Sequence, residues 1–162
     1  MTLSYILIFA ILIGAVIIWQ LRQSKSRYLR LSNQVFPELT LSILISKKER
    51  KINKLNIRID AKRDVTIERI KFELISPKRE FKYIESTEIS NSVSLPVNLK
   101  RLTTFDAIFP YEEFKIAITN EMVILNSFRV VLETQNKKVL KSHELKLDKF
   151  WKIFKADSGR YN

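Results

Sequence analysis

The sequence predicts an all-β fold, an immunoglobulin-like antiparallel β-sandwich of about seven or eight strands, preceded by a single N-terminal transmembrane α-helix. Two patterns lead to this prediction. Residues 3–21 are apolar and carry no charge, whereas from residue 37 onward apolar and polar residues alternate in short runs. The predicted organisation is an anchor helix at 1–21, a basic juxtamembrane tether at 22–36, the sandwich at 37–155 and a C-terminal tail at 156–162.

The first predicted element is the anchor helix. At 1.5 Å per residue, a helix of about 19 residues spans about 28 Å, close to the thickness of a bilayer's hydrocarbon core. Tyr5 and Trp19 lie near its two ends, where amphipathic rings settle among lipid headgroups. A cleaved signal peptide carries basic residues before its apolar run, but no Lys or Arg precedes this one. We therefore expect an uncleaved signal anchor. Ala10 and Gly14 would let two such helices pack closely, which allows a homo- or hetero-oligomer through the anchor.

The tether sets the predicted orientation. Arg22, Lys25, Arg27 and Arg30 follow the apolar run, whereas no basic side chain precedes it. The positive-inside rule therefore places the N-terminus outside and the domain in the cytoplasm, at a cell membrane such as the bacterial inner membrane. A periplasmic or otherwise extracytoplasmic domain is the alternative. We expect the tether to continue the helix along the membrane surface until Pro37 and to lie at the membrane interface, where its basic residues meet anionic headgroups.

The sandwich begins after the tether. Alternating apolar residues predict strands at 39–45, at 55–59 and over 65–75. In the third run the apolar residues change parity between Ile67 and Ile70. This change predicts a β-bulge near Glu68–Arg69, because one extra residue returns the apolar side chains to the core.

The rest of the domain continues the alternation, and no soluble helix is expected in it. Pro96 places one of these runs at the edge of a sheet, because proline cannot donate to a strand ladder. Asn136–Lys137 is predicted to form a hairpin turn before the last run. The remaining strands are predicted at 81–83, 93–99, 114–118, 128–132 and 139–147.

Composition excludes several classes of function. The chain has no Cys, which removes disulfides, thiolate metal sites and cysteine nucleophiles. Its only glycines are Gly14 and Gly159, so the domain lacks the Gly-rich loops that bind phosphates and dinucleotides. His143 is the only histidine, and its parity predicts a buried or half-buried structural side chain. We therefore predict no catalytic residues, no cofactor and no metal site.

The net charge of +12 draws the domain toward anionic surfaces, but the lysines alternate with acids and no nucleic-acid motif occurs. Nucleic acid is therefore not a predicted partner. The lipid bilayer and a protein are the predicted partners.

Two aromatic segments are candidate contact surfaces. Segment 100–113 has no clear alternation and is either a crossover between the sheets with buried aromatic side chains or a protein-binding loop. Segment 146–155 is basic and aromatic, and it is either a last core strand or lid, or a surface for anionic lipids. The candidate residues are Phe105, Ile108, Phe109 and Tyr111 for a protein partner, and Phe150, Trp151, Lys152 and Phe154 for lipid.

These observations predict a single-pass membrane protein whose non-catalytic sandwich recruits or scaffolds a protein partner. The contact would be made through the sheet edge at 93–99 or through the segment at 105–111. The alternatives are a domain that binds anionic lipid surfaces and a structural subunit of a larger membrane complex.

Overall fold

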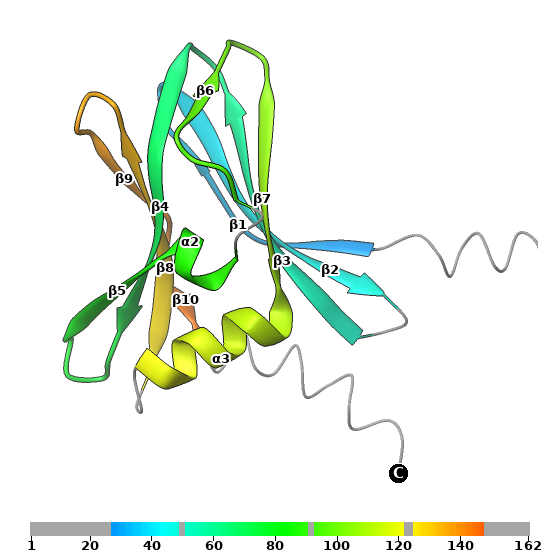
Figure 1. The fold of residues 1–162 in the computed structure, drawn as a ribbon, viewed down its shortest axis with the longest axis vertical. Coiled ribbons are helices and arrows are strands. Elements are labelled where there is room, and N and C mark those ends of the chain that lie inside the picture. The colour runs from blue at the N-terminus through cyan, green and yellow to red at the C-terminus, as the bar shows by residue number, and fades with distance from the viewer. Residues whose placement is uncertain (1–26, 49–50, 91–92, 122–124, 148–162) are drawn as a thin grey trace, which may run out of the picture.

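The computed structural model describes residues 27–48, 51–90, 93–121 and 125–147. These residues form two packed antiparallel sheets, which confirms the predicted β-sandwich (Figure 1). Sheet A has the order β1 (Arg27–Val35), β2 (Leu39–Lys48), β3 (Lys51–Ala61) and β7 (Thr104–Pro110). At the centre of sheet B, β4 (Val65–Ile75) pairs with β8 (Ser127–Thr134); β5 (Phe81–Glu85) and β6 (Val97–Leu99) pair with β4, and β9 (Val139–Lys141) and β10 (Leu145–Lys146) pair with β8.

The core lies between the sheets and follows the alternation in the sequence. On β2, Leu39, Leu41, Ile43 and Ile45 are fully buried, and β3 places alternate apolar residues on the same side. The strands predicted at 39–45 and 55–59 are therefore confirmed. The described residues contain ten strands rather than seven or eight. β1 and β7 were not predicted, and the run predicted at 139–147 is divided into β9 and β10.

The predicted bulge in β4 is confirmed. Ile67 pairs with Thr134 and Arg69 pairs with Glu133, so Glu68 is an extra residue without a register partner on β8. The insertion lets both Ile67 and Ile70 lie fully buried in the core.

The strand predicted at 114–118 is wrong, because these residues lie in helix α3 (Tyr111–Glu121). Their apolar residues alternate, yet the buried ones, Tyr111, Phe114 and Ile118, recur at helical spacing, while Ile116 is exposed. Two acidic residues in the first turn favour the helix dipole. The described residues also contain one short helix, α2 (Ser86–Ile89).

Helix α3 joins the two sheets through an aromatic cluster. The ring of Phe72 on β4 lies 5.2 Å from that of Phe109 on β7 and 4.9 Å from that of Phe114 on α3. The ring of Phe128 on β8 lies 5.4 Å from that of Phe114. Edge-to-face contacts at these distances add to the free energy gained by burying the rings. In Figure 1, α3 lies where the sheets spread apart, so Phe114 fills the core between them.

The helix expected to run through the tether to Pro37 is also wrong for residues 27–35, which form β1. This strand pairs with β2 from Arg27↔Lys47 to Val35↔Thr40, with a bulge between Arg30 and Ser32. A helix here would leave one edge of β2 without a hydrogen-bonding partner. Residues 27–35, predicted as part of the tether, are therefore a strand of the sandwich.

Several predictions fall outside the described residues. These are the anchor at 3–21 with Tyr5 and Trp19, the basic residues Arg22 and Lys25, and the aromatic segment that contains Phe150, Trp151, Lys152 and Phe154. Within the part of the chain that the structure describes, no helix has the length and apolar character that crossing a membrane requires.

Candidate functional site

Four connections meet at one end of the sandwich, which we call the loop end. They are β1–β2 (36–38), β3–β4 (62–64), β6–β7 (100–103) and β8–β9 (135–138). They surround a cavity of about 340 Å³ between the two sheets, within the size range of small-ligand and side-chain pockets. Its walls are mostly polar and come from every one of these connections; the lining residues include Glu38, Asp64, Asn98, Leu99, Lys100, Gln135, Asn136 and Lys138.

The β6–β7 connection presents an unusual leucine. Leu102 has φ 64°, in the left-handed region that bulky residues avoid, and its side chain is 83% exposed. The N–H of Thr103 donates to the Lys100 carbonyl at 3.0 Å, so Leu102 occupies the third position of a tight turn, where glycine or asparagine is usual. The fold thus holds an apolar side chain in solvent and strains the backbone to do so.

The Leu102 turn is fixed from the β3–β4 side. The N–H of Leu102 donates to the Ala61 carbonyl at 2.8 Å, and the Ala61 N–H donates to the Thr103 carbonyl at 2.9 Å. The Asp64 carboxylate accepts the Arg101 N–H at 2.9 Å and Lys100 Nζ at 3.2 Å. These two bonds, the backbone bond first, lower the pKa of Asp64 below its ordinary value. The turn is therefore held by hydrogen bonds to both ends of the β3–β4 connection.

A second contact links the two sheets across the cavity. Lys138 on the β8–β9 connection donates to Glu38 on the β1–β2 connection, and this bond lowers the pKa of Glu38. The Glu38 carbonyl also accepts the N–H groups of Lys62 and Arg63, at 2.8 and 3.1 Å. Glu38 therefore ties three of the four loop-end connections together.

Two other positions share the positive φ of Leu102. Lys137 and Arg79 have φ 58° and 64°, each in a hairpin whose hydrogen bonds place it where a G1 bulge normally has glycine. The hairpin predicted at Asn136–Lys137 is thus confirmed. Both residues are charged, so their exposure needs no explanation, whereas the exposure of Leu102 does.

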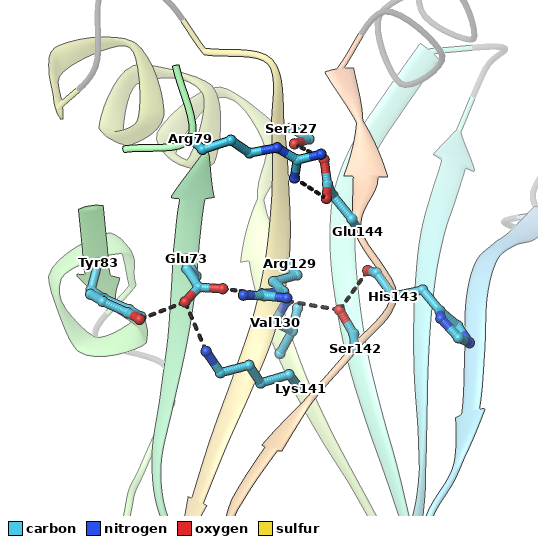
Figure 2. Close-up of polar contacts among 10 residues, drawn as sticks. All are labelled: Glu73, Arg79, Tyr83, Ser127, Arg129, Val130, Lys141, Ser142, His143 and Glu144. Atoms are coloured by element: carbon cyan, nitrogen blue, oxygen red, sulfur yellow. Dashed lines mark hydrogen bonds and ion pairs between the residues drawn. The ribbon is translucent and has the colours of Figure 1, made fainter. Parts of the chain in front are cut away.

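The outer face of sheet B carries a separate polar cluster, the Glu73 cluster, which consists of Glu73, Tyr83, Arg129 and Lys141. The register sets Tyr83, Glu73 and Arg129 side by side on β5, β4 and β8. Figure 2 shows the Glu73 carboxylate accepting hydrogen bonds from Tyr83 Oη, Arg129 Nε and Lys141 Nζ, the last at 2.9 Å. Only 2% of the Glu73 side chain is exposed.

The electrostatics of the Glu73 cluster favour a structural role. Burial alone raises the pKa of Glu73, but the hydrogen bonds from Arg129, Tyr83 and Lys141 outweigh it and lower the pKa to about 2. The hydrogen bond between Tyr83 and Glu73 in turn raises the pKa of Tyr83. A carboxylate already bound by two cations, with so low a pKa, is a poor proton donor or acceptor near neutral pH. The cluster instead fixes the register of four strands.

Neighbouring contacts complete sheet B. The Ser142 hydroxyl accepts the Val130 N–H at 2.9 Å and donates to the His143 carbonyl at 2.9 Å, bridging the break between β9 and β10 (Figure 2). Ser127 and Arg79 both donate to Glu144, and the Ser127 bond is the main cause of that residue's lowered pKa. The prediction that His143 is buried or half-buried is wrong, because its side chain is exposed beyond the end of β9. Among the described residues, no group of His, Cys, Asp or Glu is arranged to hold a metal ion.

The predicted protein-binding residues do not form one surface. Segment 100–113 crosses from β6 in sheet B to β7 in sheet A, so the crossover interpretation is confirmed. Phe109 and Tyr111 are buried in the core, Phe105 is half-buried, and Ile108 alone is exposed, on the outer face of β7. Of the edge predicted at 93–99, the strand β6 covers 97–99, and its residues Asn98 and Leu99 line the loop-end cavity.

Sequence reasoning missed Leu102 and Asp64. Leu102 is one apolar residue in a polar stretch, and nothing in its type reveals its φ. The available signal was indirect: a chain without glycine between Gly14 and Gly159 must place other residues at its left-handed turn positions.

Comparisons with known proteins assign no family. No protein-family model matches the chain, and no curated protein matches it. Among solved structures, the chain is similar to Northeast Structural Genomics Consortium target SoR45, with 7% identity over 75% of this chain and 83% of that chain. The TM-score is 0.32, and at that value the likeness carries no argument.

Proposed function

We propose that this protein is a single-pass, membrane-anchored, non-catalytic interaction module whose β-sandwich recruits a protein partner through the loop end. The anchor is the apolar segment 3–21, and the basic residues that follow it place the domain in the cytoplasm. The domain resembles immunoglobulin domains in its two packed antiparallel sheets, but its strand order β1-β2-β3-β7 differs from theirs.

The observation that carries the proposal is the state of Leu102. A non-glycine residue in the left-handed region costs about 1–2 kcal/mol, and exposing a leucine adds no compensating stability. Strain that the surroundings fix in place is a feature of binding and catalytic sites. Because Asp64 and Ala61 hold the turn rigidly, the leucine is presented as a preorganised anchor for a partner.

The loop end as a whole suits a protein contact. Two further apolar residues at this end, Val35 at the end of β1 and Val139 at the start of β9, are also about half or more exposed, at 63% and 49%. The adjacent cavity offers amide, carboxylate and ammonium groups to a side chain of the partner. Apolar anchors beside polar groups are the usual composition of interface hot spots.

The test replaces Leu102 with glycine in the full-length protein. Leu102→Gly removes the anchor and relieves the strained φ, so we expect the fold to be at least as stable while the partner is lost from pull-downs of solubilised host membranes. Lys137→Gly is the matched control, because it relieves the same strain at the same end and keeps Leu102. The proposal fails if both variants capture the same proteins as the unchanged chain.

A separate test addresses topology. A reporter fused to the C-terminus is expected to be active on the cytoplasmic side. Activity confined to the extracytoplasmic side would overturn the orientation, and a chain that washes off membranes at high salt would overturn the anchor.

A further inference from the structure

The end of sheet A opposite the loop end concentrates positive charge. We call it the basic end; it consists of Arg27 and Arg30 on β1, Lys47 and Lys48 on β2, and Lys51 and Lys54 on β3. The strand register brings them together, since Arg27 pairs with Lys47, Lys48 with Lys51, and Ser46 with both Tyr28 and Lys54. In Figure 1 the start of β1, the end of β2 and the start of β3 lie on the same side of the molecule.

The formal charge of the basic end is strongly positive. Residues 27–36 and 44–56 contain one acid, Glu49, against seven basic residues. Arg30 and Lys54 have exposed side chains, and within the described residues neither forms an ion pair. On the side of β7, Glu112 and Glu113 lie on the first turn of α3, after Pro110, which pairs with Lys54. A positive patch of this kind attracts an anionic surface.

The same end exposes an aromatic and an aliphatic side chain. Tyr28 is 57% exposed and Leu29 is 43% exposed, directly beside Arg27 and Arg30. Basic residues next to an exposed tyrosine and leucine are the combination found where proteins lie in the headgroup region of a bilayer. An acidic protein would match the charge but would not account for this position next to the predicted anchor.

The chain itself limits how far the basic end can be from the membrane. Residues 22–26 separate the predicted anchor from β1. Fully extended, they reach about 20 Å at most. The basic end can therefore approach the headgroups to within about 8 Å, one Debye length at physiological salt, where their charge acts on it.

We infer that the basic end of sheet A docks on anionic phospholipid headgroups of the leaflet next to the anchor. This inference rests on the proposed function, because it requires the anchor. Docking would orient the domain: β2 runs for 10 residues from the loop end to the basic end, about 30 Å at 3.3 Å per residue. Leu102 would then point away from the membrane toward the partner.

The test uses the full-length chain in nanodiscs of phosphatidylcholine alone or mixed with phosphatidylglycerol. Because the chain has no cysteine, Tyr28→Cys gives a single fluorophore at the basic end, and Leu102→Cys gives one at the loop end. Lipids with a nitroxide on the headgroup quench a fluorophore that lies at the membrane surface. We expect stronger quenching at position 28 in the anionic discs, no such change at position 102, and loss of the difference at 1 M salt.

Charge variants locate the contact. Each basic residue near an anionic leaflet multiplies the docked-to-free ratio by roughly five, so Lys48→Glu, Lys51→Glu and Lys54→Glu together should lower it at least a hundredfold. Lys78→Glu, Arg101→Glu and Lys137→Glu change the net charge equally elsewhere and should keep the quenching. The milder replacement of the same three lysines by glutamine should change it in the same direction, with circular dichroism confirming the fold.

The outcomes separate this inference from the proposed function. If the chain inserts into both kinds of disc but quenching at position 28 is equal in the two, the lipid contact is contradicted while the anchor is supported. Failure to insert into either disc overturns the anchor. Equal loss of quenching in the two charge variants reduces the effect to net charge and overturns the site. If the lysine variant keeps its quenching and loses a captured protein, the basic end binds protein instead.

Discussion

On the outer face of sheet B, Glu73 is almost completely buried and its carboxylate accepts hydrogen bonds from three side chains. At the loop end, Leu102 lies in solvent on a strained turn. The first region buries a charged group and supplies its hydrogen bonds, whereas the second leaves an apolar side chain 83% exposed to solvent. Exposing an apolar side chain on a strained turn costs stability, whereas the buried carboxylate has hydrogen-bond partners. The two regions therefore serve different purposes.

The difference is visible in how each region is held. The Glu73 cluster connects β5, β4, β8 and β9, so a one-residue slip of any of these strands would separate a buried charge from its partner. At the loop end, the hydrogen bonds of Asp64 and Ala61 fix the backbone and leave the Leu102 side chain free to bind.

Removing the charge of Glu73 should be the most damaging change. Glu73→Gln leaves Arg129 and Lys141 without their counter-charge in a buried site, and we expect a loss of about 3 kcal/mol in the free energy of unfolding. Glu133→Gln is the control on the same face, because Glu133 pairs with Lys71 at 2.8 Å but is 30% exposed. Its loss should stay below about 1 kcal/mol. Equal losses in denaturant titrations of the two variants would contradict the contrast.

Acid should weaken the same region. Glu73 has a pKa of about 2 in the fold against an ordinary 4.5, so between these values the unfolded chain binds more protons. The stabilisation is complete above pH 4.5 and falls by about 3 kcal/mol as the pH approaches 2. Asp64, Asp106 and Glu144 have lowered pKa values of the same sign. The contribution of Glu73 is therefore the part of the pH dependence of the free energy of unfolding that is absent from the Glu73→Gln variant.

A glycine at position 137 should stabilise the fold slightly. Lys137→Gly relieves a left-handed conformation but increases the entropy of the unfolded chain, leaving a gain of about 0.5 kcal/mol. Thermal unfolding measures it. A loss of stability in this variant would mean that φ 58° at this hairpin carries no strain.

The smallest effect on global stability is expected from Asp64→Ala. Asp64 is largely exposed, so we expect the melting temperature to remain nearly unchanged while amide hydrogen exchange speeds up at Arg101, whose N–H loses its acceptor, and at Leu102 and Thr103. Asp64→Asn, which keeps an oxygen acceptor, should restore most of the protection. Unchanged exchange at Arg101 would show that the turn is rigid without Asp64.

Much of the fold could be predicted because its core follows a period of two. Leu55 to Ile59 alternate without exception, Leu39 to Ile45 do so apart from Leu44, and even the bulge at Glu68 was visible as a change of parity. Helix α3 was missed because Phe114, Ile116 and Ile118 alternate as well. The helical spacing of Tyr111, Phe114 and Ile118 competes with that alternation over so short a segment. β1 was missed because a polar, basic stretch after an apolar run resembles a tether.

The Glu73 cluster and the Leu102 turn were harder to predict from the sequence. The partners of Glu73 lie 10, 56 and 68 residues away along the chain, and only the folded register brings them together. Leu102 depends on a backbone angle that residue type does not reveal. The predicted partner residues Phe109 and Tyr111 were chosen for being aromatic, and aromatic side chains are more often part of the core.

The position of β1 also determines how the domain would respond to mechanical load. β1 is an edge strand, and its first residue, Arg27, pairs with Lys47 at the open end of the β1–β2 hairpin. A pull at residue 26 directed across the sheet loads that pair first and then Tyr28↔Ser46, so the hydrogen bonds break one after another, whereas a pull along β1 loads them together. Tension across the sheet would therefore peel β1 away, and the remaining three strands of sheet A would stay paired until β1 had detached.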